Sequence, residues 1–104
     1  MDTDELKQYI EENSSIKTAF MEKAMAQLNK INEERSPAIR QNNAELQHQA
    51  DRMFDSFVDN IYQKILSGTP LTESDSAKQW ASVIEEAEIL DNLEESIADS
   101  DFDE

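Results

Sequence analysis

Cysteine is absent from this chain of 104 residues, and glycine and proline are nearly so, with one and two residues respectively. Without cysteine, the protein has no disulfide framework, no thiol nucleophile and no thiolate metal site. The scarcity of glycine and proline removes the usual turns of β-sheets, and no segment alternates apolar and polar residues as a half-buried strand does. We therefore expect an all-α fold.

Basic residues are also few: nine Lys and Arg stand against 24 Asp and Glu, and the formal net charge at pH 7 is −15. Such a chain repels nucleic acids and anionic lipids, because both attract Lys and Arg. No apolar run approaches the roughly 20 residues that cross a bilayer, and the N-terminus lacks the apolar core of a signal peptide. We expect no direct binding to nucleic acid, no membrane association and a cytoplasmic location.

Apolar residues recur at steps of three and four, which is typical of helix faces. Ser36 and Pro37 suit the N-cap and first position of a long helix, and Gly68 suits its left-handed C-terminal cap before Pro70. The sequence predicts an elongated bundle of three long helices, at about 15–34, 37–67 and 73–98, with a short N-terminal helix at about 4–12. We expect residues 1–98 to form a single helical domain and residues 99–104 to form a frayed acidic tail.

Helix lengths bear on the assembly of the protein. A helix over 37–67 would be about 45 Å long, against about 30 Å for the helix at 15–34. The shorter helix does not cover the longer one, so either the last helix or a second subunit must lie along it. We predict a homodimer.

The apolar face of the last predicted helix changes sides. Ala77, Trp80 and Ile84 share one side of the helix. The next apolar residues lie roughly 140–180° away around the axis, and they are Ile89, Leu93 and Ile97. A straight helix would leave these three as an apolar interface for a second subunit or a partner. A break near Glu88 would instead let both halves face one core.

Negative charge is concentrated in the same segment, because ten acidic residues and no basic residue follow Lys78. If this segment were helical throughout, it would carry one charge per roughly 4 Å, close to the 3.4 Å spacing of phosphates along one DNA strand. A solubilising acidic tail is the alternative interpretation. The candidate partner-binding residues are Glu85, Glu86, Glu88, Asp91, Glu94, Glu95, Asp99, Asp101 and Asp103.

Catalytic chemistry has little support in the sequence. Glu45 and His48 have the Glu-x-x-His spacing of di-iron bundles, but both fall outside the apolar stripe, and the chain has no second histidine. No phosphate loop, nucleophile elbow or Ser/His/Asp arrangement is present. We expect no enzymatic activity, no catalytic residue, no metal and no cofactor.

These features favour a non-enzymatic acidic interaction protein. Its carboxylates would stand in for phosphates and block the basic nucleic-acid-binding surface of a partner protein or nuclease. In style the chain resembles the small acidic inhibitors made by bacteriophages, including antirestriction and anti-CRISPR proteins; the resemblance assigns no residues. The alternative is a helical assembly or secretion chaperone, or a scaffold subunit, that binds a partner helix through its apolar strips.

Overall fold

The structure, a computed structural model, describes residues 1–99. Within that range the chain is helical and contains no strand, which confirms the predicted fold class. Its extents are 50 × 25 × 23 Å. The elements are α1 (Thr3–Asn13), α2 (Ile16–Glu34), the 3₁₀-helix η1 (Pro37–Ile39), α3 (Asn43–Gly68), α4 (Ala77–Glu86) and α5 (Ile89–Asp99).

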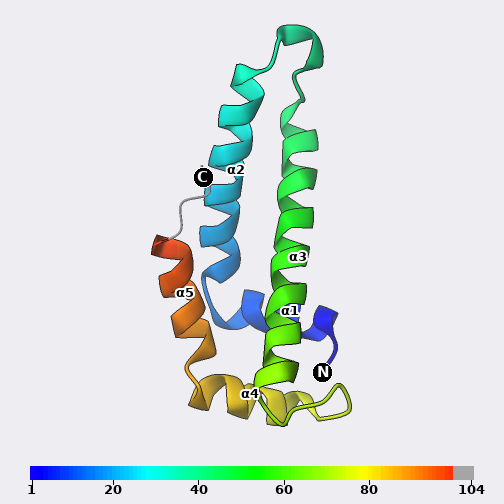
Figure 1. Ribbon diagram of the computed structural model, residues 1–104, viewed down its shortest axis with the longest axis vertical. Coiled ribbons are helices and arrows are strands. Elements are labelled where there is room, and N and C mark those ends of the chain that lie inside the picture. The colour runs from blue at the N-terminus through cyan, green and yellow to red at the C-terminus, as the bar shows by residue number, and fades with distance from the viewer. Residues whose placement is uncertain (100–104) are drawn as a thin grey trace.

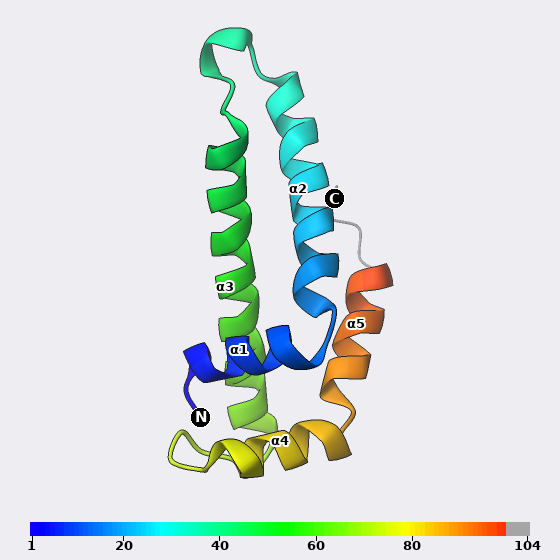
Figure 2. The ribbon, with the colours of Figure 1, turned by 180° about the vertical axis from the view of Figure 1, so that it is seen from behind.

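The two longest helices form an antiparallel hairpin along the long axis of the molecule (Figure 1). At the base of the hairpin, α4 crosses beneath it and α5 turns back along α2. Seen from behind, α1 lies across the lower part of α2 and α3 (Figure 2). Three short helices therefore surround one end of the hairpin, while its other end, which contains η1, extends away from them.

The hydrophobic core lies at this base. Its centre is Trp80, which is fully buried, stacks on Tyr62 with ring centroids 5.1 Å apart, and donates its indole N–H to the carbonyl oxygen of Thr72 at 3.0 Å. Phe20 and Phe54 meet edge to face at 5.4 Å farther up the hairpin. Toward the tip the core ends, and Ile39 is 63% exposed.

The N-terminal residue is part of the same core. The ammonium group of Met1 donates to the carbonyl oxygens of Glu73 at 2.9 Å and Asp75 at 2.8 Å, and the Tyr62 hydroxyl donates to the Met1 carbonyl oxygen at 2.7 Å. These bonds join the start of the chain to the loop between α3 and α4. Met1 itself is 6% exposed.

Two predicted helix boundaries were wrong. The long helix begins at Asn43 rather than Pro37, because Asn42 and Glu45 form a reciprocal capping box and Ser36-Pro37 opens only the short η1. Gly68 is not a left-handed cap, since it has no positive φ. The helix ends instead at Thr69, whose backbone N–H and hydroxyl both donate to the Ile65 carbonyl oxygen.

The helix predicted at 73–98 is two helices. It begins at Ala77, behind a capping box of Ser76 and Gln79, and it is interrupted at Ala87 and Glu88. Glu88 has φ 53°, in the left-handed region, which ends α4. A straight helix was therefore the wrong alternative and the break was the right one. It directs the apolar side of α5 toward the core.

Candidate partner-binding site

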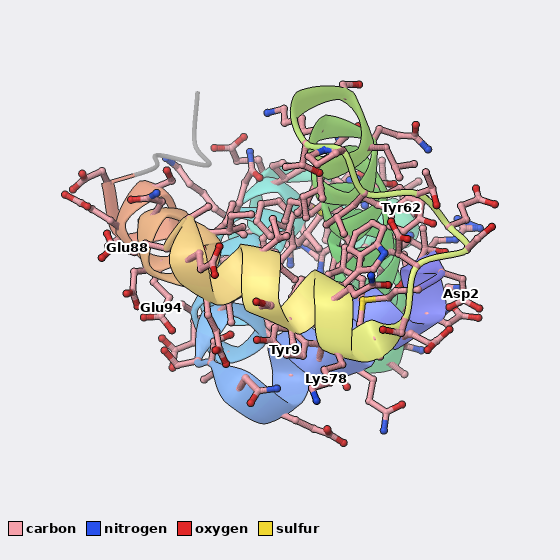
Figure 3. The ribbon with its side chains drawn as sticks, turned by 90° about the horizontal axis from the view of Figure 1, so that it is seen from below. Asp2, Tyr9, Tyr62, Lys78, Glu88 and Glu94 are labelled. Carbon is pink, nitrogen blue, oxygen red and sulfur yellow. The ribbon has the colours of Figure 1, made fainter. Side chains whose placement is uncertain are left out.

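Acidic side chains gather where α4 meets α5. A hollow of about 200 Å³ lies at this junction, and four carboxylates belong to its lining. We call these four residues the acidic corner: Glu85, Glu88, Asp91 and Glu94. Figure 3 shows Glu88 and Glu94 near the end of α4 that leads into α5. The lining also includes Asn13 from the end of α1.

The break between α4 and α5 creates this arrangement. On a straight helix, Glu85 and Glu94 would be nine residues apart, which places them on opposite sides and about 13 Å apart along the axis. The left-handed conformation of Glu88 turns the chain, so residues from both helices line one hollow. The charge pattern predicted these carboxylates, but their convergence follows from the turn.

Glu94 has a structural contact as well as a charge. Its Oε1 accepts the backbone N–H of Ser15 at 3.1 Å and the Ser15 hydroxyl at 3.4 Å. Ser15 is the N-cap of α2 but makes no capping bond with its own side chain. Because a helix N-terminus favours negative charge, this carboxylate both fastens α5 to the α1–α2 junction and complements the dipole of α2.

The other predicted binding carboxylates in α4 and α5 are exposed, although Glu86 and Glu95 do not belong to the lining of the hollow. In the described part of the chain, ion pairs join Lys7 to Asp55 at 2.6 Å and Lys17 to Glu11 at 2.8 Å. Neither pair involves α4 or α5. The negative charges at this junction are therefore not neutralised by an ion pair within residues 1–99.

At the far end of α5, Asp99 is the last helical residue and is exposed. Here Lys23 of α2 donates to the backbone carbonyl oxygens of Ile97 and, at 2.9 Å, Ala98. A basic residue at a helix C-terminus satisfies the last carbonyl groups of the helix. The two remaining candidates, Asp101 and Asp103, lie outside the described residues.

Tyr9 reports the electrostatics of this region. Burial raises the pKa of its phenol above the usual value, and the negative charge of Glu85 raises that pKa further. Both effects disfavour the phenolate. The corner is therefore a place where additional negative charge is resisted and positive charge is favoured.

The predicted apolar interface is divided between two environments. Ile97 is 3% exposed and belongs to the core. Ile89 and Leu93 are half-buried and line a second, larger cavity against α3. The break explains the difference, because it brings one side of α5 against α2 and leaves an adjoining side facing α3.

Other kinds of site were also sought in the structure. Across residues 1–99, no group of three or more His, Asp or Glu side chains is arranged to hold a metal ion. Glu45 is committed to the cap of α3, and His48 is exposed on the same helix. None of the described helices has the length and apolar content needed to cross a membrane.

Comparison with protein families, curated proteins and solved structures found nothing that matches this chain.

Some residues of the site carried no recognisable signal in the sequence. Asn13 and Ser15 belong to the turn between α1 and α2, about 70 residues before the acids that they approach. The pattern of acidic residues identified the α4–α5 carboxylates, but nothing in it indicated their partners on α1 and α2.

Proposed function

We propose that this protein is a non-enzymatic acidic inhibitor whose acidic corner blocks the basic nucleic-acid-binding surface of a partner protein or nuclease. The observation that carries the proposal is the convergence of four carboxylates on one hollow without an ion pair from the described chain. Arginine and lysine, which bind phosphates, bind carboxylates through the same charge-assisted hydrogen bonds.

The size of the hollow favours a side chain as its occupant. At about 200 Å³ it is smaller than the roughly 300–1,000 Å³ of typical small-molecule pockets. A guanidinium group from a partner would enter between Glu85, Glu88 and Asp91, while Glu86 and Glu95 would meet basic residues around it. The helices hold these carboxylates in place before binding, which reduces the conformational entropy lost on association.

The same design accounts for fast and selective association. A net charge of −15 attracts a basic protein over long range and repels nucleic acid, the natural occupant of that partner's surface. In this proposal the protein resembles phage-type antirestriction and anti-CRISPR inhibitors in strategy. Its cytoplasmic location and homodimeric state remain predictions.

A displacement experiment tests the proposal. Partners are captured from a bacterial lysate on the immobilised protein and eluted in steps of rising salt, and the eluted protein is then bound to a fluorescently labelled DNA duplex. We expect the wild-type chain to displace the duplex. We also expect Glu85→Gln/Glu88→Gln/Asp91→Asn to require at least tenfold more protein for the same displacement.

The matched control removes the same number of charges elsewhere. Glu22→Gln/Glu33→Gln/Glu34→Gln changes three exposed acids of α2 and should displace the duplex within about twofold of wild type. Equal loss in both triple variants would show that net charge alone matters. Full displacement by the corner variant would show that the corner is not the binding surface.

A further inference from the structure

A second surface feature lies on the side of α5 that faces α3. Here an elongated groove of about 440 Å³ separates the two helices. Its apolar lining comes from Phe57, Ile61 and Ile65 of α3 and from Ile89 and Leu93 of α5. The groove exists because α5 packs against α2 and α4 and approaches α3 little (Figure 1). We call it the α3–α5 groove.

The side chains within the chain leave this groove partly uncovered. Phe57, Ile89 and Leu93 are each only half-buried, although all three contact the core. At the lower end Gly68 contributes no side chain, and a Cβ placed there would meet nothing within 4 Å. Contiguous uncovered apolar surface of this kind is typical of binding sites in proteins.

The groove has the dimensions of a short helix. Its lining runs from Phe57 to Gly68 on α3, which is about 16 Å, and from Ile89 to Ser96 on α5, which is about 10 Å. These lengths correspond to two or three helical turns. A partner helix with apolar residues at positions i, i+4 and i+7 would therefore place all three within the groove.

Charge differs between the two walls. Lys64 lines the α3 wall and is the basic residue of the lining. On α5, the helical step of 100° places Asp99 about 90° and Glu95 about 130° from the direction that faces the groove, on the exposed flank. An occupant would meet mainly negative charge along α5, so basic side chains on that flank of the occupant are favoured.

We propose that the α3–α5 groove binds an amphipathic helix of another protein, with its apolar face in the groove and Lys or Arg on the flank beside α5. A helix satisfies its own backbone hydrogen bonds and can lie against apolar walls, whereas an extended peptide would need a strand edge, which residues 1–99 do not provide. An anionic lipid is disfavoured by the net charge of −15. The groove and its occupant are independent of the acidic corner and go beyond the inhibitor function.

Synthetic peptides test the chemistry of the occupant. Three fluorescein-labelled peptides of 18 residues are compared by fluorescence anisotropy: an amphipathic helix with a Leu face and Arg flank, the same composition with the Leu residues scattered, and the Leu face with a Glu flank. We expect the first to bind at least tenfold more tightly than the scattered peptide and several-fold more tightly than the Glu-flanked peptide. Equal binding of the first two would overturn the proposal.

Variants of the protein test the location. Ser96→Phe and Asn60→Phe fill the groove from opposite walls, and both positions are exposed, so the core is not altered. The control Ser82→Phe adds the same ring at an exposed serine of α4 outside the groove. We expect at least tenfold weaker binding of the Arg-flanked peptide for the two groove variants and less than a twofold change for the control.

Two further readouts keep this proposal separate from the inhibitor function. The triple variant of the acidic corner should bind the Arg-flanked peptide within about threefold of wild type. If that variant alone loses the peptide while Ser96→Phe and Asn60→Phe bind normally, the peptide binds at the corner and the groove proposal is wrong. If wild type is a dimer in light scattering and Ser96→Phe is a monomer, a second copy occupies the groove and the proposal is also wrong.

Discussion

Individual residues of the α4–α5 segment have unequal tasks although they look alike in the sequence. Glu94 and Glu95 are neighbours, yet Glu94 accepts two hydrogen bonds from Ser15 and Glu95 is exposed without such a bond. The sequence could predict that both are acidic residues of one helix. It could not predict which of them meets the N-terminus of α2, because that contact spans 79 positions of the chain.

This difference gives a paired prediction for stability. Glu94→Ala removes the acceptor for the Ser15 backbone N–H and should lower the free energy of unfolding by about 1 kcal/mol, as loss of an N-terminal helix acceptor typically does. Glu95→Ala should change it by less than about 0.5 kcal/mol. Urea denaturation of both variants makes the comparison. Equal effects would contradict the structural role of Glu94.

Tyr62 predicts how stability depends on alkaline pH. Burial raises the pKa of its phenol, and the nearby charges of Glu73, Asp2 and Glu5 raise it further. The folded protein therefore keeps the proton longer than the unfolded chain does. This contribution is fully present below about pH 10, the ordinary tyrosine value, and is lost as the pH rises through the folded pKa.

Tyr62→Phe isolates that contribution. The variant lacks the hydrogen bond to the Met1 carbonyl oxygen and should be about 1–2 kcal/mol less stable than wild type at pH 7. Above about pH 10 the difference should shrink, because only the wild type loses stability through this phenol. Denaturant midpoints measured from pH 7 to 11 follow the two proteins. A constant difference across that range would contradict the predicted burial of the hydroxyl.

At the scale of elements, the sequence predicted helices better than it predicted where they end. The first two helices were expected at about 4–12 and 15–34 and are found at Thr3–Asn13 and Ile16–Glu34. The errors occurred where several signals competed. Ser36-Pro37 and Thr72 both resemble helix starts, but tertiary contacts selected the later capping boxes of Asn42 and Ser76.

The break at Glu88 illustrates the same limit. Its sequence signal was the change of apolar side between Ile84 and Ile89, which allowed either a straight helix or a break. Burial of Trp80, Ile84 and Ile97 in one core decided between them. Glutamate has no special preference for the left-handed conformation, so only the packing on both sides identifies this position as the turn.

Glycine substitutions of opposite effect test the break. A left-handed backbone is strained for glutamate and relaxed for glycine, so Glu88→Gly should raise the free energy of unfolding by about 0.5–1 kcal/mol. Glu95→Gly places glycine inside α5 and should lower it by about 1 kcal/mol. Thermal melts monitored by circular dichroism give both values. Destabilisation by both substitutions would indicate that α4 and α5 form one continuous helix.

At the scale of the whole molecule, charge is distributed unevenly along the long axis. Residues 28–52, which include the tip of the hairpin, hold four basic and four acidic residues, whereas the rest of the chain holds five and twenty. The tip also carries the large apolar side chains that are most exposed, Ile31 at 39% and Ile39 at 63%. One end of the rod is thus strongly acidic and the other is neutral and partly apolar.

This polarity locates the predicted homodimer contact. Two copies of a −15 chain repel one another except where their surfaces are neutral, so we expect them to meet through the tip. Light scattering at tens of micromolar should give twice the chain mass of 11.9 kDa. Ile39→Ser should give the monomer mass with unchanged helix content. A wild-type monomer under these conditions would contradict the prediction.

The central claim is that the acidic corner attracts and holds a basic partner, and the kinetics of binding test it most directly. Long-range attraction acts on the encounter, so loss of charge slows association more than it speeds dissociation. The partner captured from lysate is passed over immobilised wild type and Glu85→Gln/Glu88→Gln/Asp91→Asn at two ionic strengths. We predict an association rate at least severalfold lower for the variant, a smaller change in dissociation, and a difference that narrows at high salt. Identical association rates for the two proteins at low salt would contradict the account.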